Sequence, residues 1–154
     1  EDTMDKATIL ICYDGTADSD RAIDAAAELF GRRHSVVVDI GPVITPAESV
    51  IALTSAPVGA FEDLNLDSAR EGARAGAERA RRAGFDAEPR AEVAAPTWEG
   101  IVEVADEIDA AVIVLGSRGL KGIREQLAVS VSHEVAEHAG RPVLIVPPPN
   151  ERVS

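Results

Sequence analysis

The stretch from Val112 to Val146 constrains the fold of this 154-residue chain more than any other. It holds two short apolar runs, Val112–Leu115 and Val143–Val146, with the length of strands buried on both faces. Glycines at 116, 119 and 122 and a helical pattern separate the two runs. Strand, glycine loop, helix and strand is how α/β proteins bind anions, because free loop N–H groups and the helix dipole both favour negative charge there.

The same alternation of strand-like and helical patterns runs through the rest of the chain. Strand patterns occur at Thr8–Tyr13, Ser35–Ile40 and Phe85–Val93, the last with Pro89 inside, which is typical of an edge strand. Helical patterns lie between them, and such alternation predicts a parallel sheet covered on both faces. We expect one domain over residues 8–147, a flexible N-terminus over 1–7 and a C-terminal tail over 148–154.

Local signals predict where some helices begin. Asp18 or Ser19 is a candidate cap for the helix that ends before Gly31, and Thr97 is a candidate cap for the helix that contains Trp98. A third helix is predicted over Ser68–Ala83, with small residues along one stripe. Residues 43–64 are the least regular part, with one short helix expected over 47–55, and form either a cover for a site or a surface excursion.

Composition narrows the partners and the compartment. A formal net charge of −12 argues against nucleic acid and anionic membranes as partners. Against this background, Arg118, Lys121 and Arg124 concentrate positive charge in the glycine loop, either for a phosphate or as a solvated basic loop. Cys12 is the only cysteine, which excludes an internal disulfide and favours a reducing compartment. With neither a secretory signal pattern nor a long apolar run, we expect a cytoplasmic protein.

Polar turns follow the first and fourth strands. Asp14-Gly15-Thr16 comes after the first and Gly116–Gly119 after the fourth. Ligands of doubly wound sheets bind at the carboxyl ends of strands where the strand order reverses. If these two strands are neighbours, an acidic side chain faces a glycine-lined basic loop across one crevice, which is the shape of a nucleotide site.

The segments ILICYDGT and LGSRGLKGIREQLAVSVSHEVAEHAGRPVLIVP resemble the universal stress protein family, over Thr8 to Pro147. The resemblance implies a doubly wound five-stranded parallel sheet in the order 3-2-1-4-5 with helices on both faces, close to the adenine nucleotide alpha hydrolase-like and flavodoxin-like folds. It also implies a homodimer. Many members bind ATP with weak or no hydrolysis, others bind no nucleotide, and the biological output is adaptation to stress.

The ATP-binding members carry G-x-x-G, nine residues, then G-S or G-T. Gly116 and Gly119 match the first pair and Ser130 the final hydroxyl, but Val129 replaces the third glycine. A β-branched residue suits neither a positive φ nor close approach to phosphate, and one lost phosphate contact costs about 1–3 kcal/mol, roughly tenfold to a hundredfold in affinity.

Asp14 matches the acidic residue that the family carries after the first strand, and it could also contact magnesium carried by ATP. Strand-two residues near Ile40 would flank the adenine. The resemblance therefore implies these nucleotide-binding residues: Asp14, Gly15, Thr16, Ile40, Gly116, Arg118, Gly119, Val129, Ser130, Val131 and Ser132.

These observations predict a dimeric stress-response protein that binds an adenine nucleotide weakly as a regulatory switch. No catalytic residue is assigned, and slow ATP hydrolysis is the most we expect. The alternative is a dimeric interaction module that has lost ATP binding and acts through a protein partner, which the sequence does not specify. Val143–Val146 is short, apolar and without charges that would block pairing, so we expect it to form the dimer edge.

The sequence HEVAEH comes close to the zinc motif H-E-x-x-H. His133 and His138 are five residues apart. That spacing places them about 140° apart around a helix, so they are not expected to share one metal. His133 could instead touch a bound phosphate or be solvated.

Overall fold

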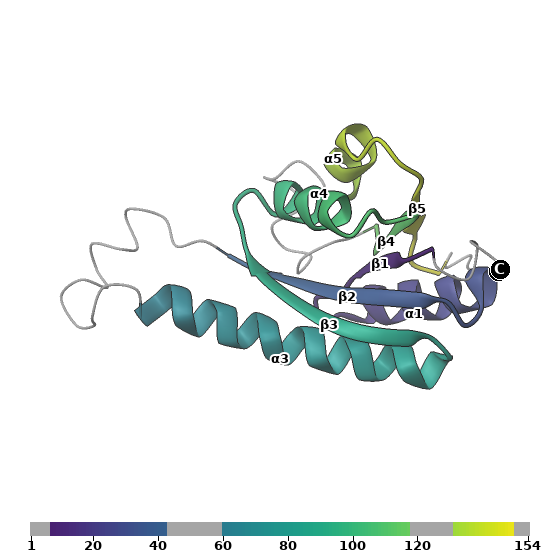
Figure 1. The fold of residues 1–154 in the computed structure, drawn as a ribbon, viewed down its shortest axis with the longest axis horizontal. Coiled ribbons are helices and arrows are strands. Elements are labelled where there is room, and N and C mark those ends of the chain that lie inside the picture. Colours follow the sequence, from purple (N-terminus) through teal and green to yellow (C-terminus); the bar gives the residue numbers. More distant parts are fainter. Residues whose placement is uncertain (1–6, 43–59, 118–130, 150–154) are drawn as a thin grey trace, which may run out of the picture.

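The computed structural model describes residues 7–42, 60–117 and 131–149, which form a parallel five-stranded sheet between two helical layers (Figure 1). The strands lie in the order β3-β2-β1-β4-β5, which confirms the predicted fold class and strand order. Their bounds are β1 Ile9–Cys12, β2 His34–Gly41, β3 Asp86–Val93, β4 Val112–Gly116 and β5 Val143–Val146.

Two helices cover each face of the sheet (Figure 1). Helices α1 (Ala17–Phe30) and α3 (Ala60–Ala83) lie on one face, and α4 (Thr97–Glu107) and α5 (Val131–His138) lie on the other. Alternation along β2 divides its side chains between two cores: Val37 packs with α1 and α3, and Val36, Val38 and Ile40 pack with α4 and α5. Among the described residues, no helix combines the length and apolar character needed to cross a membrane.

The two sheet edges differ in character. β3 is an edge strand, as its pattern predicts, and it carries Pro89 and several charged side chains. β5 forms the opposite edge, and its four apolar residues Val143–Val146 are all half-buried. One edge is therefore protected by charge and proline, and the other is an apolar strand with an open side.

Helix α3 is longer than the pattern predicts, because it begins at Ala60 instead of Ser68. Its early turns are held by the end of β2: Asn65 Nδ2 donates to the carbonyl of Pro42 at 2.9 Å, and a Cβ on Gly41 would lie 2.9 Å from the Asn65 carbonyl oxygen. This contact between distant segments explains why local periodicity missed the start. The irregular segment was predicted over 43–64, and this is wrong for residues 60–64, which belong to α3. Residues 43–59, with the helix expected over 47–55 and the choice between a cover and a surface excursion, lie outside the described residues, as do residues 1–6 and 150–154 of the predicted termini.

The structure also corrects two predicted caps. Thr16 caps α1, its Oγ1 accepting from the backbone N–H of Ser19 at 3.3 Å, so neither Asp18 nor Ser19 is the cap. Pro96 occupies the cap position of α4 without a side-chain hydrogen bond, and Thr97 is already helical. A cap residue needs an extended backbone, which Thr16 and Pro96 have.

A stripe of small residues lets α3 lie close to the sheet, as predicted. The buried residues are Ala69, Ala73, Ala77 and Ala80. The closest approach is at Gly76, where an added Cβ would lie 2.7 Å from both Tyr13 Cγ and Val37 Cγ1. The absence of a side chain at position 76 therefore sets the distance between α3 and the ends of β1 and β2.

We expect Gly76→Ala to destabilise the fold by about 1–3 kcal/mol, because the methyl group must displace Tyr13 or Val37. The loss should appear in urea unfolding even though alanine is the better helix former by up to about 1 kcal/mol. Glu78→Ala, at an exposed position of the same helix, is the matched control and should change stability by less than about 0.5 kcal/mol. Equal stability of Gly76→Ala and wild type would show that the contact is not tight.

Candidate functional site

A cleft opens at the carboxyl ends of β1, β2 and β4, with a volume of about 450 Å³ measured out to its open mouth. β1 and β4 pair directly, Ile9 opposite Val112, as predicted, and Asp14 and Gly116 at the ends of these two strands line the same cleft. Apolar side chains line its interior: Val38, Ile40, Ile101, Leu115 and Val131. Cys12, Tyr13, Asp14, Thr16, Asp18, Ser19, Asp39, Thr97 and Gly116 complete the lining.

The turn after β1 presents one carboxylate to this cleft. Gly15 has a φ of +80°, a conformation that favours glycine, and it lets the chain turn between Asp14 and Thr16. Asp14 Oδ1 accepts from the backbone N–H of Thr16 at 3.0 Å and from Thr16 Oγ1 at 2.5 Å. Asp14 Oδ2 has no hydrogen-bond partner within the described ranges, so it remains an acceptor for a ligand.

The described lining is acidic. Asp14, Asp18 and Asp39 contribute carboxylates, and Asp18 is ion-paired with Arg21. Within 7–42, 60–117 and 131–149, no lysine, arginine or histidine lines the cleft. This part of the cleft therefore suits an apolar ring with hydrogen-bond donors around it, and cations for a phosphate would have to come from another segment or from a metal ion.

Gly116 has a packing role that the sequence pattern did not indicate. A Cβ at this position would lie 3.0 Å from Asp18 Cβ and 3.1 Å from the Asp18 carbonyl oxygen. The first turn of α1 thus rests against the end of β4, and glycine is required for that contact alone. The motif interpretation, in which Gly116 gives a phosphate close access to the backbone, is not needed to explain it.

The remaining predicted site residues divide into three groups. Ile40 and Val131 line the cleft. Ser132 is buried, and its Oγ donates to the Ser117 carbonyl oxygen at 3.4 Å, so it anchors α5 to the end of β4. Four predicted residues lie outside the described residues: Arg118, Gly119, Val129 and Ser130.

Sequence reasoning missed several lining residues. Thr97 and Ile101 come from α4, Leu115 from β4 and Tyr13 from the end of β1. Leu115 could have been found, because it is the last apolar residue before the carboxyl end of β4. Thr97 and Ile101 could not have been found from the sequence, because they line the cleft only as a result of the close approach of α4 to β2 at Gly100.

Comparison with known proteins agrees with this geometry. The model of the Universal stress protein family matches residues 7–147. The chain belongs to this family. Universal stress protein YxiE of Bacillus subtilis (strain 168) is 29% identical over 144 residues, covering 90% of this chain and 97% of that protein.

Solved structures show the same fold. A universal stress protein in complex with cAMP has a TM-score of 0.64 and 29% identity, covering 91% of this chain and 96% of its own. Hypothetical protein MJ0577 superimposes with a TM-score of 0.72 at 18% identity, covering 94% of this chain and 98% of its own, and this likeness concerns the fold alone.

Cys12 lies on the cleft side of β1 in this universal stress protein. Burial, with a further contribution from the negative charge of Asp14, raises the pKa of its thiol to about 12. The thiol is therefore protonated at neutral pH and is a poor nucleophile. Cys12 therefore serves packing on this side of β1.

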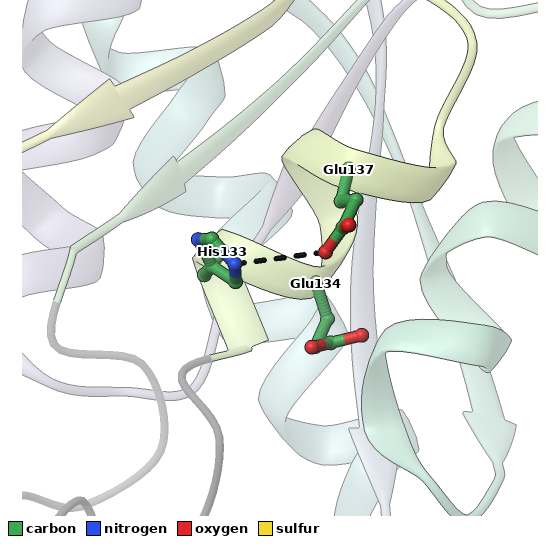
Figure 2. A group of neighbouring side chains, drawn as sticks. All are labelled: His133, Glu134 and Glu137. Carbon is green, nitrogen blue, oxygen red and sulfur yellow. Dashed lines mark ion pairs between the residues drawn. The ribbon is translucent and has the colours of Figure 1, made fainter.

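The two histidines of the HEVAEH segment do not meet. His133 Nε2 lies 3.6 Å from Glu137 Oε2, whereas His138 stacks on Trp98 of α4. His133, Glu134 and Glu137 place one potential ligand atom each within 4.8 Å of one another (Figure 2). The side chains of His133 and Glu137 are 69% and 61% exposed, and His133 lies in the first turn of α5, where the helix dipole disfavours a cation. We interpret them as a solvated ion pair.

The corrected caps give a matched pair of variants. Thr16→Ala removes the side-chain acceptor for Ser19 N–H and the hydroxyl donor to Asp14 Oδ1, and should cost about 1 kcal/mol of unfolding free energy. Thr97→Ala removes no cap hydrogen bond and should cost less than about 0.5 kcal/mol. Urea unfolding of both variants measures the difference, and a larger loss for Thr97→Ala would contradict the assignment.

Proposed function

We propose that this chain binds an adenine nucleotide in the cleft and acts as a regulatory switch in the response to stress. The observation that carries the proposal is the cleft itself, whose lining combines apolar side chains with Asp14 Oδ2, an acceptor that has no hydrogen-bond partner among the described residues. A relative with 29% identity over 91% of this chain was solved with cAMP, which supports a ligand built on adenine.

The slot suits the base and the sugar. Val38, Ile40 and Ile101 offer apolar surface to the faces of a purine, and Asp14 Oδ2 can accept from a ribose hydroxyl. Gly116 and Val131, which stand on either side of residues 117–130 in the sequence, both line the cleft. With Arg118, Lys121 and Arg124 in its sequence, this segment is the natural source of phosphate contacts in an otherwise acidic site.

ATP with magnesium is the ligand we favour, held weakly because Val129 stands where the family motif has glycine. Asp14 Oδ2 suits contact with a magnesium ion carried by the phosphates, whereas Asp18 is already paired with Arg21. One carboxylate oxygen does not make a hydrolytic centre. A switch that reports nucleotide occupancy fits these residues better than an efficient ATPase, and we place its role in the cytoplasm because the chain carries a single, unpaired cysteine.

A magnesium–ATP titration by calorimetry tests this proposal on wild type, Val129→Gly and Asp14→Asn. We expect weak binding by wild type, binding about tenfold to a hundredfold tighter by Val129→Gly, and weaker binding by Asp14→Asn. If wild type shows no binding of ATP, ADP or AMP at millimolar concentration while Val129→Gly binds, the result would favour the alternative of an interaction module that has lost nucleotide binding. Silence of all three proteins would overturn the nucleotide proposal.

We also propose that the chain forms a homodimer through the open edge of β5, whatever its ligand. Pro142 and Val146 direct their carbonyl groups to β4, so alternation leaves the backbone groups of Val143 and Ile145 pointing to the open side. Half-buried apolar side chains along this strand would be covered by a second copy.

Val143→Pro removes an outward N–H at the first residue of a strand, a position where proline is tolerated, and breaks no hydrogen bond to β4. Light scattering at micromolar concentration should show a dimer for wild type and a monomer for the variant. Circular dichroism of both proteins controls for loss of fold. A monomeric wild type would contradict this assembly.

A further inference from the structure

The indole of Trp98 and the imidazole of His138 form a stacked pair that joins α4 to α5 beside the cleft. Their ring centroids are 4.4 Å apart and the planes are inclined by 23°. His138 Nδ1 also donates to the carbonyl oxygen of Glu134 at 2.9 Å, which fixes the ring against its own helix. The pair is one of the contacts by which α5, a helix of only 8 residues, is held to the rest of the fold.

The two ends of α4 are held differently. At its C-terminal end, Arg141 Nη1 donates to the carbonyls of Ala105 and Ala110 at 3.1 and 2.7 Å, and Nη2 lies 2.6 Å from Asp106 Oδ1. At its N-terminal end, Pro96 supplies no side-chain hydrogen bond. The first turn of α4 therefore depends on packing, and Trp98 is its largest side chain.

That first turn forms a wall of the cleft. Thr97 precedes Trp98, Ile101 follows one turn later, and both line the cleft. Val131, at the start of α5, lines it as well. We infer that His138 is a positioning residue for the ligand site. By stacking on Trp98 it fixes the position of the first turn of α4, which lines the cleft, relative to α5.

A second contact on its own helix also holds His138. The Nδ1 atom of His138 lies 3.4 Å from Glu134 Oε2, so the imidazole is placed both by α5 and by the indole of Trp98 on α4.

The test compares His138→Ala, His138→Phe, which keeps a stacking ring without the proton, and His133→Ala, an exposed histidine of the same helix. The first readout needs no ligand: the rate at which iodoacetamide alkylates Cys12, the only cysteine, on the cleft lining. Because the buried thiol is a poor nucleophile, it reacts when the cleft opens, and the rate therefore reports how readily the α4 wall moves. His138→Ala should be alkylated about threefold to tenfold faster than wild type, and His138→Phe and His133→Ala within twofold of it.

The second readout is the emission of Trp98, the only tryptophan. Loss of the stacked ring in His138→Ala exposes the indole to water, so its emission should shift to longer wavelength. His138→Phe and His133→Ala should emit at the wavelength of wild type. Thermal unfolding followed by circular dichroism confirms that each variant is folded under these conditions.

The third readout is the affinity for AMP, measured by calorimetry, and this part rests on the proposed nucleotide function. His138→Ala should bind about threefold to tenfold more weakly, whereas His138→Phe should bind like wild type. Cys12 alkylation equal in His138→Ala and His133→Ala would overturn the inference. If wild type binds no AMP but the alkylation rates differ as expected, the nucleotide proposal fails and the positioning role of His138 stands.

Discussion

The parallel pairing of β1 with β4 is the constraint on which the rest of this structure depends. The strand order reverses between these two strands, and the helices that follow them in the chain, α1 after β1 and α5 after β4, lie on opposite faces of the sheet. Asp14 and Gly116 lie in the same cleft for this reason, although they are distant in sequence.

Glycines without a strained backbone then set the width of that cleft. Gly116 admits the first turn of α1, Gly76 admits the ring of Tyr13 beneath α3, and a Cβ on Gly100 would lie only 2.6 Å from Ala94 Cβ. Each glycine serves close packing of a helix against its neighbours, which in turn brings Asp18, Tyr13 and Thr97 to the cleft. The contacts that pack these helices therefore also place the residues of the cleft. A methyl group at any of these three glycines would disturb both the packing and the cleft.

The predictions from sequence were correct for features that depend on a single strand or helix. β4 and β5 were found from their apolar runs, and the edge position of β3 from its proline and charges. The cap of α1 was misplaced because Thr16, Asp18 and Ser19 are all good caps, and only the backbone conformation chooses among them. The start of α3 was missed because Asn65 and Pro42, far apart in sequence, hold its first turns.

The sequence by itself determined the alternation of strands and helices, the acidic turn at Asp14 and the family to which the chain belongs, because these depend on residue type and spacing along the chain. Only the tertiary structure decided that Gly116 accommodates Asp18, that α4 begins without a side-chain cap, and that Trp98 stacks on His138. These features arise where surfaces of different elements meet. Which surfaces meet is set by strand order and helix packing, and no local pattern encodes it.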